Sequence, residues 1–448
     1  MAAYSALLTM GATWRVSGLP NSQSQSMGLL RNYVSLASYG SNLLAGSGYP
    51  ISGEHLANYG SVVFVSSDNG SAWTEADSGL SGMHTELTSL IVNGSDIYAG
   101  TYPGGIFLST NGGVSWINSS SGMNNKNVYA LASNGLDIFA GTNGGGVNLS
   151  TNNGLNWSAV NFGLTDTSIK TLTINGSNIF AGAIITVGAI WSPRYSNDVF
   201  ITSDNGTNWA KIDSQSTPTT NALITCLSAN GSNLVVGTGN TIRNLDGIKW
   251  SPIGAVYRLT FDGAKWNRSD SALSGNYVTS LVSSGPNFFA GTYTGGVFAS
   301  SNNGVNWNAI SDGLTDSSVV SLVIHNSNLF AATSSGVWRR PLSEITSVLP
   351  PDGTLPKNYS LEQNYPNPFN PTTMLQYQLP NAGHVTLKVY DLLGRNVETL
   401  VNEVKVAGSY SVSFNGEKLA SGVYIARLVA QSKEGKFFTQ TKKMLMIK

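Results

Sequence analysis

The chain has 448 residues, its 24 Lys and Arg are balanced by 24 Asp and Glu, and only 11% of its residues are charged. The zero net charge gives no electrostatic support to a nucleic-acid or anionic-membrane partner, and no apolar run reaches the ~18 residues of a membrane span. The 50 glycines and a charge content well below the ~25% usual in soluble domains are typical of a turn-rich all-β protein.

The N-terminus carries only a weak secretory signal. No basic residue precedes Arg15, and residues 1–10 have only a weak apolar core. We interpret the chain either as a mature form or as one whose true start is missing. Cys226 is the only cysteine and lies in the apolar run 223–227, which predicts a buried structural thiol. The four histidines are scattered, so we expect neither a metal site nor a cofactor.

An internal repeat dominates residues 1–340. An Ala-Gly-Thr-like element recurs seven times, at Ala45, Ala99, Ala140, Ala181, Val236, Ala290 and Ala331. The successive spacings are 54, 41, 41, 55, 54 and 41 residues, so the base period is 41 residues with extensions. A period of ~40–45 residues with four short strands per unit predicts a β-propeller, here with seven blades.

Each repeat predicts four strands, which we call A to D from the centre outward. Strand A is a Val/Leu run such as 128–132, strand B an Ile-Phe-Ala-Gly segment, strand C a Gly-Val-Phe segment, and strand D starts at a Trp. The seventh repeat passes into Pro341 without that Trp, whereas residues 11–15 supply a Gly-x-x-Trp ending before the first strand A. The N-terminal strand is therefore predicted to be strand D of blade seven, which closes the ring and removes an open edge.

A turn of the form Ser/Thr-x-Asp/Asn-x-Gly-x-x-Trp precedes strand D in six repeats. Asp and Asn accept backbone N–H bonds within their own turn, and Gly supplies a positive φ. The pattern resembles the Asp-box, or BNR, repeat of sialidases, Asp-box xyloglucanases and related secreted propellers, over about residues 10–340. Three boxes carry Asn, which favours a turn-forming role over catalysis. The six Asp/Asn and Trp pairs are Asp68 and Trp73, Asn111 and Trp116, Asn152 and Trp157, Asp204 and Trp209, Asp262 and Trp266 in a shortened copy, and Asn302 and Trp307.

Three blades carry longer segments between strands B and C. The strand-B glycine precedes the box by 9 residues in blades two, three and six, but by 20, 20 and 23 residues in blades one, four and five. These insertions share the face opposite the boxes, and exposed aromatics beside polar groups suit sugar or peptide recognition. The alternative is that they only pack against neighbouring loops. The predicted ligand contacts are Tyr59, Trp191, Arg194, Tyr195, Arg243, Trp250 and Tyr257.

Our leading hypothesis is a non-catalytic propeller that binds a glycan or a protein. The propeller has few arginines and lacks a Phe/Tyr-Arg-Ile-Pro segment, which disfavours a sialidase. A polysaccharide-acting hydrolase stays open as the alternative, with carboxylates drawn from Glu54, Glu86, Asp198 or Asp246. Against it, acids recur at matched repeat positions, as in the Gly-Leu-Thr-Asp segments that end at Asp166 and Asp316. A third hypothesis is that the propeller is mainly a rigid spacer.

A second module follows a Pro-rich stretch, residues 341–358, which is predicted to be an extended linker. Within residues 359–448, the segments 374–379, 385–390, 410–414 and 423–429 alternate apolar and polar residues as half-buried strands do. About 90 residues of such strands predict a small Ig-like β-sandwich.

The motifs of this module carry a specific resemblance. Residues 361–373 read LEQNYPNPFNPTT, residues 389–395 VYDLLGR, residues 419–424 LASGVY and residues 442–448 KKMLMIK. They resemble the type A sorting domain of the type IX secretion system of Bacteroidetes-like bacteria. The resemblance implies recognition of residues 359–448 by the translocon, export to the extracellular space or the outer-membrane surface of a Gram-negative bacterium, and usually removal of the module.

Overall fold

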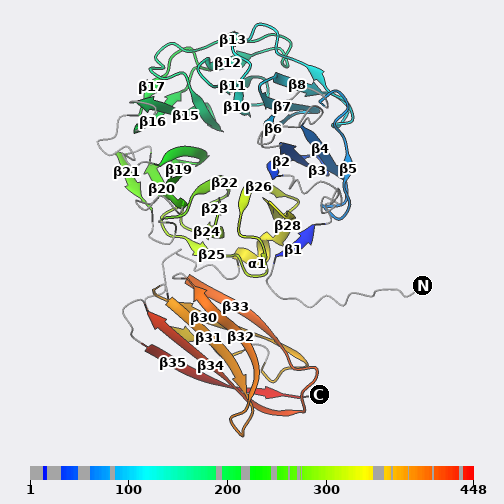
Figure 1. Cartoon of the computed structure of the whole chain (residues 1–448), viewed down its shortest axis with the longest axis vertical. Coiled ribbons are helices and arrows are strands. Elements are labelled where there is room, and N and C mark those ends of the chain that lie inside the picture. The colour runs from blue at the N-terminus through cyan, green and yellow to red at the C-terminus, as the bar shows by residue number, and fades with distance from the viewer. Residues whose placement is uncertain are drawn as a thin grey trace, which may run out of the picture.

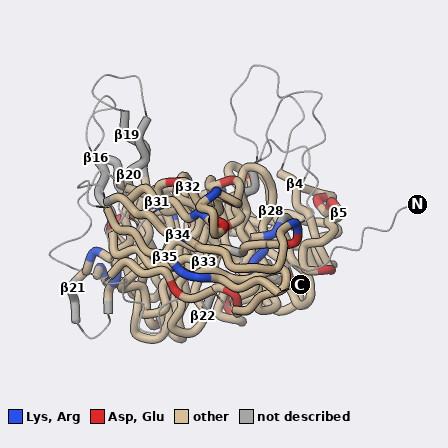
Figure 2. Tube along the Cα trace, turned by 90° about the horizontal axis from the view of Figure 1, so that it is seen from below, with Lys and Arg blue, Asp and Glu red and all other residues tan. Residues whose placement is uncertain are grey.

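The computed structural model describes residues 14–17, 32–48, 61–80, 86–187, 194–212, 222–243, 250–260, 263–269, 273, 275–346, 358–364, 367–381, 383–405, 408–432 and 437–447. Their strands form a ring of seven four-stranded antiparallel sheets beside a smaller two-sheet body (Figure 1). The predicted seven-bladed β-propeller followed by a small β-sandwich is confirmed. Charged residues are sparse along the described part of the trace (Figure 2). No helix among the described residues is long and apolar enough to cross a bilayer.

The seven blades follow one another along the chain, and strand A is innermost in each (Figure 1). Blade one contains β2 (Asn32–Tyr39), β3 (Asn42–Gly48), β4 (Val62–Ser66) and β5 (Thr74–Glu75), and blade two contains β6 (Glu86–Asn93), β7 (Asp96–Tyr102), β8 (Gly105–Ser109) and β9 (Ile117–Asn118). Blade three contains β10 (Val128–Ser133), β11 (Ile138–Thr142), β12 (Gly146–Ser150) and β13 (Ser158–Ala159), and blade four contains β14 (Ile169–Asn175), β15 (Asn178–Val187), β16 (Arg194–Thr202) and β17 (Ala210–Lys211). Blade five contains β18 (Leu223–Asn230), β19 (Asn233–Arg243), β20 (Trp250–Thr260) and β21 (Gly263–Arg268), and blade six contains β22 (Val278–Ser284), β23 (Asn287–Thr292), β24 (Gly296–Ser300) and β25 (Asn308–Ala309).

Blade seven joins the two ends of the propeller sequence. It contains β26 (Val319–His325), β27 (Asn328–Thr333), β28 (Gly336–Pro341) and, at its outer edge, the N-terminal β1 (Arg15–Ser17). Arg15 pairs with Arg339 and Ser17 with Val337 in antiparallel register. The N-terminal strand therefore completes the seventh sheet and covers the edge of β28, so that only a strand of three residues remains at the outer edge.

Apolar side chains fill the space between neighbouring sheets. Leu36 and Phe64 of blade one, for example, pack with Phe330 and Val337 of blade seven. Among the described residues a core of this kind joins every blade to the next. The ring is thus held by seven similar cores, each of which buries the face of a sheet that water would otherwise cover. Cys226 is buried in one of them, and burial raises the pKa of its thiol to about 12.

The box turns have one repeated geometry. In blade two the Ser109 hydroxyl donates to Asn111 Oδ1 (2.9 Å) and accepts from the Gly113 amide (2.9 Å), and Asn111 Oδ1 accepts from the Ser115 amide (2.9 Å). Gly113 has a φ of 95°, a value that suits glycine. Asp68, Asn152, Asp204 and Asn302 make the matching turns, whereas Asp262 lies outside the described residues. Because the acceptor oxygen is satisfied locally by the turn itself, these residues build corners.

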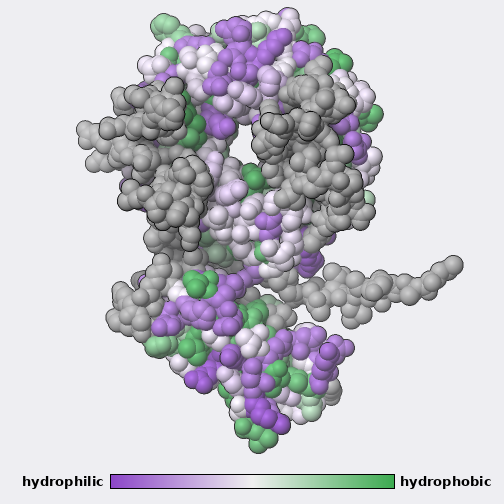
Figure 3. Space-filling model, viewed as in Figure 1, coloured by the Kyte–Doolittle hydropathy of each residue, from purple (hydrophilic) through white to green (hydrophobic). Residues whose placement is uncertain are grey.

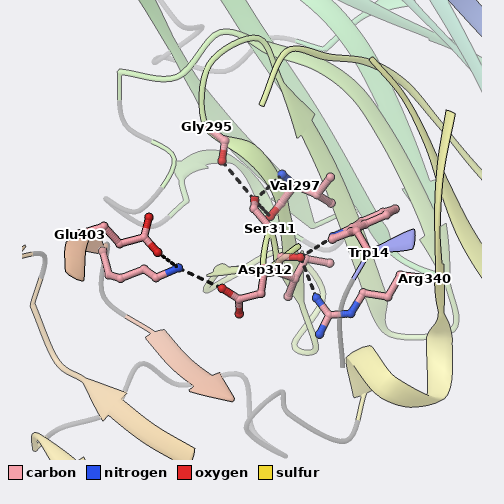
Figure 4. A network of polar contacts seen from close by, with 9 residues as sticks. Trp14, Gly295, Val297, Ser311, Asp312, Arg340 and Glu403 are labelled. Atoms are coloured by element: carbon pink, nitrogen blue, oxygen red, sulfur yellow. Dashed lines mark hydrogen bonds and ion pairs between the residues drawn. The ribbon is translucent and has the colours of Figure 1, made fainter. Parts of the chain in front are cut away.

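In four of the described blades the tryptophan at the start of strand D clamps the blade to the preceding one. Trp116 donates through its amide to the Ser78 carbonyl (2.8 Å) and through Nε1 to the Ala76 carbonyl (2.9 Å). Trp14 does the same for the closing strand, to the carbonyls of Asp312 (3.1 Å) and Ile310 (2.6 Å) (Figure 4). Equivalent bonds are made by Trp157 to Ser121 and Ser119, and by Trp209 to Phe162 and Val160.

The propeller extends past its predicted boundary. Pro341 still belongs to β28, where it pairs with Asn328, and the short helix α1 (Leu342–Thr346) follows with Ile345 fully buried against blades six and seven. The interpretation of residues 341–358 as a linker is therefore corrected for residues 341–346. Proline is tolerated here because it is the last residue of β28. Residues 347–357 lie outside the described part of the chain.

The second body is a β-sandwich with one apolar core. One sheet has the order β29 (Ser360–Leu361), β30 (Thr372–Leu379), β33 (Gly408–Asn415), and the other has the order β32 (Asn396–Lys405), β31 (Gly383–Tyr390), β34 (Gly422–Ser432), β35 (Phe437–Met446). The alternating segments found in the sequence lie in β30, β31, β33 and β34. Tyr377 stacks on Tyr410 inside the core, with ring centroids 5.2 Å apart.

Candidate functional site

A β-bulge interrupts the innermost strand of every blade at the same position. At each bulge the pairing of strands A and B shifts by one residue, for instance between Leu87 and Ser89 in β6. The bulged residues are Val34, Thr88, Tyr129, Lys170, Thr225, Thr279 and Val320. Bulges re-aim a side chain and are common beside functional sites. They lie near the end of the sheet that carries the B–C and D–A connections, which we call the loop-bearing face.

Threonine at the bulge has a structural role. The Thr88 hydroxyl lies 2.9 Å from the carbonyl of Gly100 in its own blade and 2.9 Å from the carbonyl of Val128 in the next blade. Thr225 and Thr279 repeat this bridge between blades five and six and between blades six and seven. A hydroxyl at this position therefore joins two inner strands.

The other four blades lack this threonine: blades one and seven carry Val34 and Val320, and blades three and four carry the larger Tyr129 and Lys170. The Tyr129 ring stacks on Tyr102, at the end of β7 in blade two, with centroids 5.6 Å apart and planes within 2°. The Lys170 ammonium lies over the same Tyr129 ring, 4.2 Å from its centroid. Glu86 is paired with Tyr102 across β6 and β7. We call Glu86, Tyr102, Tyr129 and Lys170 the rim cluster, because they lie near the loop-bearing ends of β6, β7, β10 and β14. The innermost strands of the blades surround a central opening (Figures 1 and 3).

Partial burial sets the electrostatics of the rim cluster. It raises the pKa of Glu86, an effect that the charge of Lys170 opposes, and it lowers the pKa of Lys170, an effect that Glu86 opposes. Burial also raises the pKa of Tyr129, with further contributions from Tyr102 and Glu86. Among the described residues no ion pair engages Lys170, whose ammonium is held by the Tyr129 ring. The cluster thus places two aromatic rings beside an ammonium group that can donate hydrogen bonds.

The acids considered for hydrolysis do not come together as a catalytic pair in the described structure. Asp198 is 3% exposed and forms an ion pair with Lys211 (2.8 Å). Its other neighbour is Asp166, whose pKa burial and contact with Asp198 raise to about 6. Glu86 lies in β6 of blade two and Asp198 in β16 of blade four, so the two described candidates belong to blades that are not neighbours. Glu54 and Asp246 lie outside the described residues, and within the described part no group of three His, Cys, Asp or Glu is placed to hold a metal.

The predicted ligand residues lie in different parts of the structure. The insertions in blades four and five lengthen β15, β16, β19 and β20, so their B–C connections are long hairpins. Arg194 and Tyr195 begin β16, and Arg243 pairs with Trp250 at the end of the β19–β20 ladder. Tyr257 was expected in a loop, but β20 extends through it and its side chain is buried in the core between blades four and five. We therefore exclude Tyr257 from the proposed contacts. Tyr59 and Trp191 lie outside the described residues.

Sequence reasoning missed Tyr102, Tyr129 and Lys170. The signal was available at the bulge position of strand A, where five repeats carry Thr or Val and two carry Tyr and Lys. The side chain at that position is re-aimed by the bulge, and the alternation of apolar and polar residues in the sequence does not reveal a bulge. Glu86 was considered only as a candidate carboxylate.

Comparisons with known proteins identify the second module and the fold. Residues 363–446 match the family described as the secretion system C-terminal sorting domain. No curated protein matches the sequence of the chain. The structure is similar to YCF48 bound to D1 peptide, with a TM-score of 0.54, 14% identity and coverage of 75% of this chain and 98% of that one. It is also similar to the extracellular domain of BT4673 from B. thetaiotaomicron, with a TM-score of 0.53, 12% identity and coverage of 97% of this chain and 59% of that one.

The fold and the module together define the class. The chain is a β-propeller that carries a C-terminal sorting domain. It is a secreted or cell-surface protein of Bacteroidetes-type bacteria, as the resemblance in its sequence predicted, and the sorting domain implies interaction with the secretion machinery.

Proposed function

We propose that the propeller is a non-catalytic binding module that recognises a glycan or a protein on its loop-bearing face, after export through the type IX secretion system. The observation that carries this proposal is the rim cluster, where Tyr129 and Lys170 occupy the bulge position at which blades two, five and six carry a bridging threonine. Stacked rings offer apolar contact to a sugar or side chain, and the ammonium fixes orientation through a charge-assisted hydrogen bond.

The departure from the bulge threonines supports a binding role for the cluster. Tyr129 and Lys170 cannot form the two-carbonyl bridge that Thr88 makes, and burial lowers the pKa of Lys170. Departures from the pattern of a repeat are expected at functional positions. The two similar structures fit this role, since YCF48 was solved with a bound peptide and the BT4673 domain is extracellular.

The hairpins β15–β16 and β19–β20 are proposed to extend the same surface. They leave the loop-bearing face from blades four and five, next to Lys170 of blade four. Arg194, Tyr195, Arg243 and Trp250 belong to these strands and stay proposed contacts because of their residue types. Tyr59 and Trp191 keep their place in the proposal on sequence grounds alone.

The test is a screen of the full chain on an array of neutral oligosaccharides, uronic-acid oligosaccharides and peptides. The variant with Tyr129→Thr and Lys170→Thr installs the residue of blades two, five and six, and we expect it to lose at least about tenfold in affinity for any probe that the native chain binds. The matched control combines Tyr39→Thr, near the opposite face, with Lys443→Thr in the sorting domain. Equal binding by all three proteins would overturn the site, and a native chain that binds no probe would favour the spacer hypothesis.

A further inference from the structure

The sorting domain contacts the propeller at blade six, next to the seam where the ring closes. Strand β25 packs against β33, and Ala309 of β25 contacts the sandwich core (Figure 1). The Lys405 ammonium, at the end of β32, lies 2.9 Å from Asp312 Oδ1 of the propeller and 3.0 Å from Glu403 Oε1 of its own domain (Figure 4). Lys405 also lies 5.2 Å from the centroid of the Tyr410 ring.

This contact is largely shielded from water. The Lys405 side chain is 16% exposed and that of Asp312 is 25% exposed. Burial alone would lower the pKa of Lys405, but Asp312 and Glu403 more than offset this and raise it. An ion pair held in such surroundings is screened less by salt than one on an open surface. The contact therefore has the character of a specific docking interaction.

Asp312 occupies a position that repeats around the ring. Its counterparts are Ser78, Ser121 and Phe162, and at all four positions the backbone carbonyl accepts the amide of the following blade's tryptophan. At Asp312 that tryptophan is Trp14, the residue before β1. Asp312 thus bonds the closing strand through its backbone carbonyl and the sorting domain through its carboxylate (Figure 4).

Apart from the burial of Trp14 in the core between blades six and seven, the described contacts of the closing strand are few. β1 has three residues and pairs with β28 alone. Besides the Trp14 clamp, Arg15 forms an ion pair with Glu344 of α1 (3.3 Å), and both groups are partly exposed. The neighbouring Arg340 donates to the same Ile310 carbonyl as Trp14 (2.7 Å). Short terminal strands open at low free energy, so a further contact at Asp312 matters here.

We propose that the surface of blade six formed by Ala309 and Asp312 is a docking site for the chain's own sorting domain, and that docking holds the N-terminal strand in the ring. The 310–312 segment is the shared element. When Lys405 fixes the Asp312 side chain, the carbonyls of Ile310 and Asp312 stay positioned for Trp14. The attached tail then latches the seam of the propeller that it accompanies through export.

Hydrogen–deuterium exchange on the full chain tests this latch. In Lys405→Met, which leaves every propeller residue unchanged, we expect the amides of residues 14–17 to exchange about fivefold faster, the change that follows from losing about 1 kcal/mol. Asp312→Ser installs the residue of blades one and two and should give the same result while keeping the backbone clamp. The matched control, Lys443→Met, removes an exposed lysine of the same domain and should change nothing.

Three outcomes would overturn the proposal. The first is unchanged exchange of residues 14–17 in both variants. The second is faster exchange in all blades equally, which indicates general destabilisation. The third is faster exchange of residues 14–17 in Asp312→Ser alone, which would show that the effect arises inside the propeller without the tail.

Discussion

Asp166 and Asp316 show how one sequence motif acquires two chemical environments. Both end a Gly-Leu-Thr-Asp segment. Asp316 accepts hydrogen bonds from the Ser334 hydroxyl (2.7 Å) and from the Ser335 and Ser318 amides (2.8 and 2.9 Å), and although burial alone would raise its pKa, these bonds lower it. Asp166 belongs to blade four, whose short B–C turn is replaced by the β15–β16 hairpin, and faces Asp198 instead.

The pH dependence of stability should therefore differ between these two positions. An acid whose folded-state pKa is raised from 3.8 to about 6 binds more protons when folded, so its contribution to stability falls as pH rises from about 4 to about 6. Asp166→Asn should accordingly raise the melting temperature at pH 7.5, by about 2 °C, and change it little at pH 4. Asp316→Asn should lower it at pH 7.5, because its stabilising carboxylate is lost. Thermal unfolding at both pH values measures this, and shifts of the same sign at pH 7.5 would contradict it.

The bulge threonines allow a second prediction at single residues. Thr88→Val keeps the shape of the side chain but removes the hydroxyl that bridges Gly100 and Val128. We expect a loss of about 1 kcal/mol in the free energy of unfolding, since the carbonyls lose a buried partner. Tyr129→Thr should cost less or even stabilise, because it introduces that hydroxyl. Urea unfolding of both variants tests the contrast, and a neutral Thr88→Val would remove the structural role assigned to these threonines.

At the scale of the element, the clamp between blades depends on close backbone approach. Gly122 has a φ of 88°, and a Cβ at this position would lie 2.3 Å from the Trp157 carbonyl oxygen. Gly176 in the β14–β15 turn has a φ of 61° with open space around it. Gly176 therefore needs glycine for its backbone conformation alone, whereas Gly122 needs it for both its conformation and its packing against Trp157.

Alanine substitutions at these glycines should have unequal costs. Gly176→Ala should destabilise by about 1 kcal/mol, the cost of a left-handed backbone for an L-residue. Gly122→Ala should cost roughly 2 kcal/mol more, because the clamp must also move. Chemical denaturation of both variants gives the two free energies. Equal losses would show that the approach of Gly122 to Trp157 is not needed for blade packing.

At the scale of the whole molecule, the sequence was informative where the chain repeats. The number of blades follows from seven strand-B elements, and the sandwich follows from alternating segments, because both patterns report burial of one face. The extension of the propeller to Thr346 was missed, since Pro341 reads as a break although it pairs with Asn328. Tyr257 was misplaced because a long insertion reads as a loop, whereas the strands of this hairpin are lengthened.

The candidate site was harder to predict for a physical reason. Tyr102, Tyr129 and Lys170 come from three blades, and neither their spacing nor their types form a motif. They meet because the bulges bring inner-strand side chains of neighbouring blades into contact, which is a property of the ring. A comparison of repeats, position by position, would have identified the two exceptional bulge residues but not their stacking.

The rim cluster of this exported propeller is proposed to bind its ligand. The most direct measurement is the dissociation constant of the strongest array probe for the native chain and for the variant with Tyr129→Thr and Lys170→Thr, together with the melting temperatures of both. We predict an affinity at least about tenfold weaker, equivalent to about 1.4 kcal/mol, with melting temperatures within about 2 °C. An unchanged dissociation constant for a folded variant would contradict the claim.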